Sequence, residues 1–213
     1  MGADDRARAF ERALLAMDRV GARETLLAAA EGTDTLAVAE SVVAPALERI
    51  GDDWEHGTVS LAQLYMAGRI AEQIVSEVLP HVRPGDGEHP ELAIAVLEDH
   101  HALGKRLVLS ALRAAGHAVA DYGHGVTVER LVKRCHDDKP RVLLISTLML
   151  PAALRVREVV SRLAPPAPRP VVIVGGAPFR LDPDLWGEVG ADATGRNSAE
   201  AIALVGRFTG GLR

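Results

Sequence analysis

The stretch Glu98-Asp99-His100-His101-Ala102-Leu103-Gly104-Lys105 decides how the chain folds, because of the segments on either side of it. An apolar run at residues 92–97 precedes it, and a helical pattern over 105–115 follows it. This succession predicts a buried parallel strand, a short polar turn and a helix. Ligands of such sheets bind in the crevice at the carboxyl ends of the strands. The polar turn is therefore expected to belong to a functional site.

The residues of this turn suit a metal and a large flat ligand. His101 offers a neutral imidazole nitrogen to a metal, and Asp99 can hold the other ring nitrogen and fix the tautomer. Gly104 allows a ligand to approach the backbone closely. His100 is a rival for His101, but the spacing to Asp99 and Gly104 favours His101. The alternative interpretation is that Asp99 is an ordinary helix N-cap next to an exposed loop histidine.

The region after residue 91 alternates between two periodicities. Strands are expected at residues 92–97, 117–121, 141–145, 171–174 and 191–194, and helices at 105–115, 127–137, 151–163, 181–189 and 198–208. Alternating strands and helices predict an α/β domain, with a parallel sheet covered on both faces. Five strands favour the flavodoxin-like, Rossmann-like order.

Residues 1–79 show helical patterns and no strand pattern. Helices are expected around the apolar stripe from Ala9 to Met17, at 23–31, at 36–50, and from a cap at Ser60 onward. Gly21 and Gly51 are expected to end helical segments, and Pro45 to kink or break the third helix. An antiparallel helical bundle is the expected packing.

A change of composition separates the two regions. The segment containing Pro84-Gly-Asp-Gly87 has no apolar periodicity and is typical of a linker. The predicted organisation is a helical bundle at 1–79, a linker at 80–91 that acts as the hinge, and a sheet domain at 92–213.

Composition narrows the class of protein. Hydrophobic residues make up 48% of the 213 residues, which is enough for real cores, and the net charge of −5 does not favour nucleic acid or a membrane surface. With no membrane span or signal-peptide core in the sequence, a cytoplasmic protein is expected. Cys135, the single cysteine, is interpreted as packing inside a helix. Glu98 and Lys105 are expected to be solvated.

The pattern Asp-x-His-x-x-Gly formed by Asp99, His101 and Gly104 resembles the signature of the B12-binding (cobalamin or corrinoid) domain family. The resemblance implies that His101 is the lower axial ligand of cobalt. In this family the histidine displaces the dimethylbenzimidazole of the cofactor, whose nucleotide tail enters a slot beside the sheet. The implied cofactor is cobalamin, with methylcobalamin as the expected form.

Further residues resemble the family in the expected order, each at the end of a predicted strand. Ser146 and Leu148 match a Ser-x-Leu motif, in which the serine faces the nucleotide tail. Gly175 and Gly176 match the Gly-Gly pair that lines the slot, where a side chain would block the tail. Residues 190–195 resemble the segment that closes the far side of the slot.

One departure from the family concerns proton control. Many members carry a serine or threonine a few residues beyond Ser-x-Leu, which completes a relay with the histidine and aspartate. This chain has Met149-Leu150-Pro151-Ala152 there, without a hydroxyl. Proton control is then expected to depend on Asp99 and water.

The N-terminal helices resemble the cap domain that precedes B12-binding domains, with the match running over residues 47–67. In the family this bundle covers the upper face of the corrin. Trp54 is either an aromatic lid in the cofactor site or an ordinary core residue, and both interpretations stay open. Light-sensing relatives have Glu-His where this chain has Leu64-Tyr65, which weakens a photoreceptor function.

The function implied by the resemblance is that of a corrinoid protein. Such a protein binds cobalamin base-off and His-on, and carries a methyl group between methyl-donor and methyl-acceptor methyltransferase proteins. It would be a non-catalytic subunit without direct contact to nucleic acid or membrane, and a homodimer is possible. The alternative is a B12-dependent regulatory or light-sensing module that acts on a transcription factor. A flavodoxin-like domain that binds flavin is a distant third.

Overall fold

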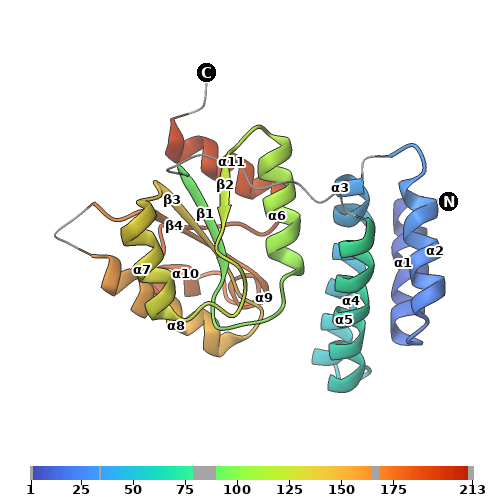
Figure 1. Cartoon of the computed structure of the whole chain (residues 1–213). Helices are drawn as coiled ribbons and strands as arrows, with labels where there is room; N and C mark the ends of the chain where they lie inside the picture. The colour runs from blue at the N-terminus through green and yellow to red at the C-terminus, as the bar shows by residue number, and fades with distance from the viewer. Residues whose placement is uncertain (1, 34, 79–89, 165–167, 211–213) are drawn as a thin grey trace. The chain divides into compact units, whose positions relative to one another are not determined.

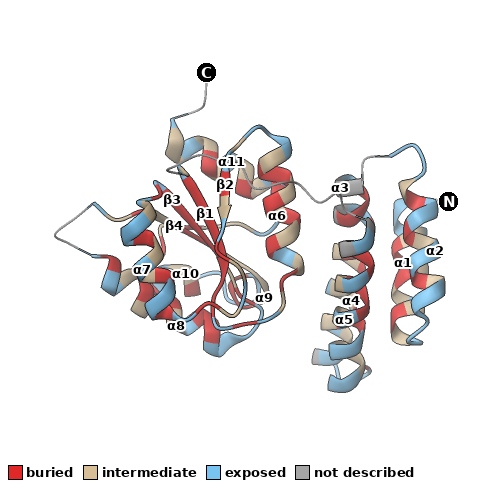
Figure 2. Cartoon of the chain, in the orientation of Figure 1, coloured by how far each residue is buried: buried red, intermediate tan, exposed pale blue. Residues whose placement is uncertain are grey.

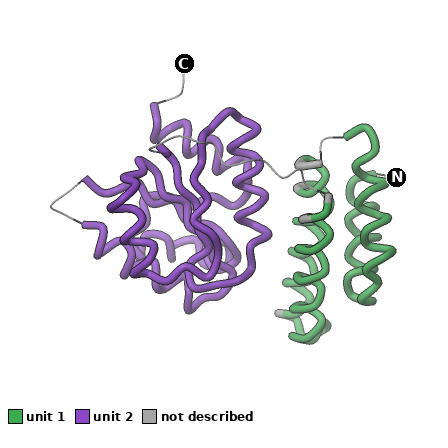
Figure 3. Tube along the Cα trace, viewed as in Figure 1, with its two compact units in different colours: residues 1–81 green, residues 82–213 purple. Residues whose placement is uncertain are grey.

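The computed structural model describes residues 2–33, 35–78, 90–164 and 168–210. The chain divides into two compact units, residues 1–81 and 82–213 (Figure 3). Most of the predicted linker and hinge at 80–91 lies outside the described residues, as do residues 165–167. Among the described helices, none is long and apolar enough to cross a membrane.

The first unit is helical, as the sequence predicts (Figure 1). Its elements are α1 (Ala3–Leu15), α2 (Arg19–Ala30), α3 (Thr35–Val38), the π-helical segment η1 (Ala39–Val43), α4 (Ala44–Glu55) and α5 (Leu61–Val78). Each of these segments contributes buried side chains to the core, which includes Phe10, Leu14, Leu26, Ile50 and Ile74, each at most 2% exposed. Ser60 caps α5: its Oγ accepts from the Gln63 amide at 3.3 Å, and its own amide donates to Gln63 Oε1 at 3.1 Å.

Two expectations about helix ends in this unit are wrong, those for Gly21 and Gly51. Gly21 lies in the first turn of α2, where its amide donates to the capping Asp18 carboxylate at 2.9 Å. Gly51 lies inside α4, because burial of one face of that helix outweighs the roughly 1 kcal/mol that a helical glycine costs. Pro45 is the second residue of α4, and the single helix expected at 36–50 is divided just before it, where η1 ends. At that point the helix widens, so that the Ala44 amide donates to the Ala39 carbonyl in the π-helical pattern.

The second unit is a five-stranded parallel sheet covered by helices. The strands are β1 (Leu92–Val96), β2 (Val119–Asp121), β3 (Val142–Ser146), β4 (Val171–Gly175) and β5 (Ala193–Thr194). Their order is β2-β1-β3-β4-β5, which confirms the flavodoxin-like prediction. The helices are α6 (Leu103–Ala114), α7 (Val128–Asp138), α8 (Leu150–Leu163), α9 (Ala177–Leu181), α10 (Leu185–Glu188) and α11 (Ser198–Thr209).

Each face of the sheet has its own core, and Figure 2 shows the strands as mostly buried. One face packs mainly against α7, α8, α9 and α10, and the other against α6 and α11. Cys135 lies in the first core at 4% exposure, where burial, together with the nearby Asp138 charge, raises its pKa to about 12. Its interpretation as a packing residue is confirmed.

The single helix predicted at 181–189 is wrong, since the structure has the two short helices α9 and α10 there. Pro183 explains the break. A residue before proline avoids the helical region, and Asp182 adopts an extended conformation with φ −120° and ψ 101°.

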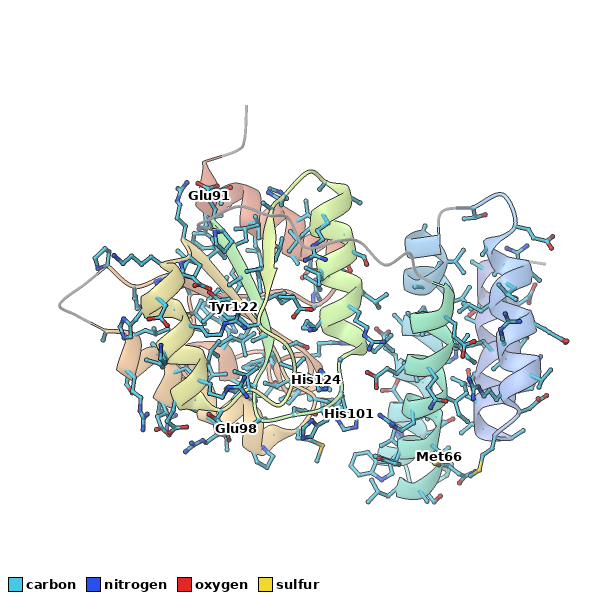
Figure 4. All side chains as sticks on the ribbon, viewed as in Figure 1. Met66, Glu91, Glu98, His101, Tyr122 and His124 are labelled. Atoms are coloured by element: carbon cyan, nitrogen blue, oxygen red, sulfur yellow. The ribbon has the colours of Figure 1, made fainter. Side chains whose placement is uncertain are left out.

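The register of the sheet brings the ends of the strands level. Val96 pairs with Ser146, Ser146 pairs with Gly175, and Val174 pairs with Thr194. In Figure 4, Glu91 lies at the opposite end of the sheet from Glu98, His101 and His124. The loops that follow β1, β3, β4 and β5 therefore meet along one edge, as expected for a ligand site of this fold.

Candidate functional site

The turn after β1 holds Asp99 and His101 in contact. The Nδ1 atom of His101 lies 2.6 Å from Oδ1 of Asp99, and the His101 amide donates to the same oxygen at 3.0 Å. The Asp99 side chain is 2% exposed, whereas that of His101 is 30% exposed. An ionised carboxylate only accepts hydrogen bonds, so this contact places the ring proton on Nδ1 and the lone pair on Nε2. The Nε2 atom is therefore the nitrogen suited to bind a metal.

The other oxygen of Asp99 accepts two backbone amides from the loop after β3. Leu148 donates to Oδ2 at 2.8 Å and Met149 at 3.1 Å. Burial acts to raise the pKa of Asp99, but the hydrogen bonds from His101, Leu148 and Met149 outweigh it and hold that pKa below its usual range. The segment from Met149 to Ala152 has no side-chain hydroxyl to offer Asp99. The hydrogen bonds that Asp99 receives from this loop come instead from backbone amides.

His100, the rival for the metal-binding role, lies in different surroundings. A Cβ at Gly125 would come within 2.5 Å of its ring, and that ring meets His124 edge-on with centroids 5.8 Å apart. The structure thus brings His101, not His100, to the Asp99 carboxylate. The N-cap interpretation of Asp99 is wrong, because α6 begins after Ala102, which has no side-chain cap.

Gly104 and Ser146 lie close together, on α6 and at the end of β3. A Cβ added at Gly104 would lie 3.5 Å from Ser146 Oγ, which is an ordinary contact distance. The protein itself therefore has room for a side chain at residue 104. The backbone of Gly104 also avoids positive φ. Neither packing nor backbone conformation inside this unit requires a glycine at residue 104. The reason predicted from the sequence, close approach of a ligand, stays a prediction.

The surroundings of Gly175 and Gly176 inside this unit already require glycine at both positions. A Cβ at Gly176 would lie 1.7 Å from the Thr147 carbonyl oxygen, and Gly176 has φ +118°. A Cβ at Gly175 would lie 2.9 Å from the Gly195 carbonyl oxygen. Both glycines are thus required by the close approach of neighbouring backbone segments at this edge of the sheet. Their role in lining a slot stays a prediction.

Two buried hydroxyls at the same edge were not singled out as site residues from the sequence. Oγ1 of Thr147 and Oγ1 of Thr194 are buried and have no hydrogen-bond partner among the described residues. Native structures seldom leave buried polar atoms unpaired, so each atom suits a ligand group. A threonine at the carboxyl end of a buried strand is the signal that could have identified them.

Apolar side chains are exposed beside Asp99. Leu148, Met149 and Leu150 are 43%, 53% and 53% exposed, and they follow one another after β3. Single exposed apolar residues are common, but three in succession at a ligand-binding edge are typical of a surface that a ligand or a protein covers.

The two charged residues that flank the turn, Glu98 and Lys105, differ in their exposure. The expectation for Lys105 is wrong: it is 4% exposed, and its Nζ lies 2.5 Å from Asp121 Oδ1. Glu98 is exposed, as expected, and it also forms a two-point ion pair with Arg155 of α8. The error for Lys105 arose because this residue lies on the face of α6 that turns toward β2.

Trp54 lies near the end of α4 and is 43% exposed. Its interpretation as an ordinary core residue is therefore wrong. Its role as a lid over the cofactor stays a prediction, as the two units are described separately.

Comparison with known proteins shows what this chain is similar to. A family model described as B12 binding domain matches residues 92–203, and a second model with the same description matches 6–78. Monomethylamine corrinoid protein 1 of Methanosarcina barkeri is 32% identical over 186 residues, covering 83% of this chain and 84% of that protein. Trimethylamine corrinoid protein 1 of Methanosarcina mazei is 26% identical over 195 residues, covering 88% and 89%.

A solved structure agrees as well. That of the Methanosarcina barkeri monomethylamine corrinoid protein has a TM-score of 0.74 and 28% identity, and the match covers 92% of this chain and 94% of that one. Two family models with the same description match this chain, and a relative above 30% identity aligns along most of both chains. These matches indicate one family. The chain belongs to the B12-binding corrinoid proteins, and cobalamin is its cofactor.

Proposed function

We propose that this chain binds cobalamin base-off and His-on, with His101 as the lower axial ligand, and carries a methyl group between methyltransferase proteins. The observation that carries the proposal is the 2.6 Å contact between His101 Nδ1 and Asp99 at the carboxyl edge of the sheet. That contact leaves Nε2 as the basic nitrogen of the ring. The relatives described above support the carrier role, because their names share the words corrinoid protein.

The residues at this edge fit the chemical groups of cobalamin. The Nε2 atom of His101 suits the cobalt, since neutral imidazole is a common metal ligand. The exposed Leu148 and Met149 suit the apolar parts of a large ring. The unpartnered hydroxyls of Thr147 and Thr194 suit the polar nucleotide tail. We assign the tail to the region of these two threonines and Ser146.

When bound, cobalamin supplies a cobalt that can accept and release a methyl group. The contribution of the chain is to set the donor strength of His101. Asp99 stays ionised at neutral pH, because its pKa lies below the usual range, and its carboxylate accepts a hydrogen bond from Nδ1–H of the imidazole. The amides of Leu148 and Met149 keep Asp99 in place, since an amide donates a hydrogen bond but takes no proton.

The partners in this proposal are a methyl-donor and a methyl-acceptor methyltransferase. The relatives are named after both monomethylamine and trimethylamine, so their names do not select one donor. Methylcobalamin as the resting form and a homodimer stay predictions, as does a hinge at 80–91.

The test is a visible spectrum of the full chain loaded with hydroxocobalamin. We expect a base-off, histidine-ligated spectrum for the wild type and loss of the histidine-ligated form in His101→Ala. His100→Ala is the matched control and should keep the wild-type spectrum, since its ring packs against Gly125 and His124. An unchanged spectrum in His101→Ala contradicts the ligand assignment.

A second measurement separates a carrier from a sensor. The full chain loaded with methylcobalamin is examined by size-exclusion chromatography before and after illumination. A carrier should keep its association state when light removes the methyl group. A change of association state with light would favour the regulatory alternative.

A further inference from the structure

Among the residues that the structure describes, Lys105 is a buried charged side chain to which the proposed mechanism gives no role. Lys105 is the third residue of α6, one position after Gly104, and its side chain is 5% exposed. Its Nζ lies 2.5 Å from Oδ1 of Asp121, the last residue of β2. The Asp121 side chain is 34% exposed, so only the lysine end of this ion pair is buried, and such a pair is a weak source of stability. Its position next to the metal-binding turn calls for another explanation.

Asp121 connects this lysine to the loop after β2. The Oδ1 atom that meets Lys105 also accepts the amide of Gly123 at 2.8 Å. The carbonyl of Gly123 accepts the amide of Val96 at 3.0 Å, and the amide of Gly125 donates to the Asp99 carbonyl at 2.7 Å. The loop after β2 is therefore bonded to the segment where the metal-binding turn begins.

Lys105 supplies the connection at the other end of the same turn. The turn leaves β1 at Val96, passes through Asp99 and His101, and enters α6 at Leu103. Its beginning is held by Gly123 and Gly125, and its end by the contact from Lys105 to Asp121. One acidic side chain thus links both ends of the segment that carries His101.

We infer that Lys105 and Asp121 form a positioning clamp, which sets the location of the first turn of α6 and thereby the orientation of the His101 imidazole. The inference rests on the proposed function, in which His101 binds cobalt. Neither residue is a ligand. The clamp acts through the backbone, as supporting residues of metal ligands do elsewhere, where their loss typically weakens the metal bond by about 10–100-fold.

The test removes both charges together, so that no buried charge is left unpaired. In the full chain, Lys105→Met with Asp121→Asn keeps the oxygen that accepts the Gly123 amide. The matched control is Lys133→Met with Asp137→Asn on α7. That pair has the same 2.5 Å contact, but its side chains are 75% and 55% exposed.

Two readouts report on the orientation of His101. One is the ring 15N chemical shifts of His101 in the cofactor-free protein. The other is the ratio of histidine-ligated to histidine-free cobalt in the visible spectrum with hydroxocobalamin. We expect the Lys105 double variant to fold, to change the His101 shifts, and to lower the ratio by about 10-fold. The control should match the wild type in both.

The outcomes separate this inference from the proposed function. A wild-type spectrum identical to that of His101→Ala overturns both. A histidine-ligated wild type, combined with wild-type shifts and spectrum in the Lys105 double variant, overturns the clamp alone. A Lys105 double variant that fails to fold also overturns it, because the pair would then be an element of stability.

Discussion

Glu98 and Arg155 form a two-point ion pair between the turn after β1 and helix α8. Arg155 Nε lies 3.2 Å from Glu98 Oε2, and Arg155 Nη2 lies 3.2 Å from Oε1. Glu98 has φ +44°, which is rare for a residue other than glycine, asparagine or aspartate. This residue immediately precedes Asp99. The backbone is therefore strained next to the turn that carries Asp99 and His101, and such strain is frequent at functional sites.

Two substitutions of Glu98 should distinguish the energetic cost of the backbone strain from the stabilisation by the ion pair. Glu98→Ala loses the pair and keeps the strain, and an exposed pair of this kind contributes about 0.5 kcal/mol. Glu98→Gly loses the same pair but relieves about 1 kcal/mol of left-handed strain. We therefore expect the free energy of unfolding in urea to be higher for Glu98→Gly than for Glu98→Ala. If Glu98→Gly were less stable than Glu98→Ala, the claim that the backbone at residue 98 is strained would be wrong.

Asp99→Asn should weaken the bond between His101 and cobalt without unfolding the protein. The amide side chain keeps an oxygen for the Leu148 and Met149 amides, but it loses the charge that strengthens the imidazole. The expected loss is about 10–100-fold in the ratio of histidine-ligated to histidine-free cobalt. The visible spectrum measures this ratio, and Asp137→Asn on the exposed face of α7 is the control.

The same substitution should change how stability depends on pH. The pKa of Asp99 is lower in the folded chain than in the unfolded one, so the ionised carboxylate stabilises the fold above the unfolded pKa of about 3.9. This contribution is lost as the pH falls through the folded pKa. Wild type should thus exceed Asp99→Asn in free energy of unfolding at pH 7, with the difference shrinking below about pH 4. A difference independent of pH would contradict the assignment.

Much of this architecture could be predicted from residue patterns alone. Strand order, the alternation of strands and helices, and the pairing of Asp99 with His101 depend on local periodicity and on a short spacing. The burial of Lys105 could not be predicted, because its partner Asp121 lies 16 residues away on another strand. The donors to Asp99 from Leu148 and Met149 are backbone amides, which every residue except proline carries.

Two glycines of the site should respond to alanine in opposite ways. Gly176→Ala should prevent folding or cost several kcal/mol, because the new Cβ would lie 1.7 Å from the Thr147 carbonyl oxygen at a positive φ. Gly104→Ala should leave the stability of the cofactor-free chain unchanged within about 1 kcal/mol, since its Cβ makes an ordinary contact with Ser146. It should still weaken cobalamin binding, if the glycine serves the ligand. Thermal unfolding and equilibrium binding of hydroxocobalamin measure the two effects, and normal binding by Gly104→Ala would contradict the ligand role.

Removing the unpartnered hydroxyls of Thr147 and Thr194 should not reduce the stability of the cofactor-free chain, but it should weaken cobalamin binding. A buried hydroxyl without a partner costs about 1–3 kcal/mol, and valine has nearly the same shape. Thr147→Val and Thr194→Val should therefore leave the cofactor-free chain at least as stable as wild type. If the cofactor supplies the missing hydrogen bond, each variant should bind cobalamin about 10-fold more weakly, which corresponds to about 1.4 kcal/mol. Equilibrium titration with hydroxocobalamin measures this loss.

Thr209 offers the control for these variants, because its hydroxyl already has a partner. Oγ1 of Thr209 donates to the Val205 carbonyl at 2.8 Å within α11. Thr209→Val should lose that bond, reduce stability by up to about 1 kcal/mol and leave cobalamin binding unchanged. Loss of a hydroxyl that binds the cofactor should thus reduce cobalamin affinity but not stability. Loss of a hydroxyl that is bonded within the fold should reduce stability but not affinity. Wild-type cobalamin affinity in both strand-end variants would mean that the nucleotide tail lies elsewhere, because neither hydroxyl would then be satisfied by the cofactor.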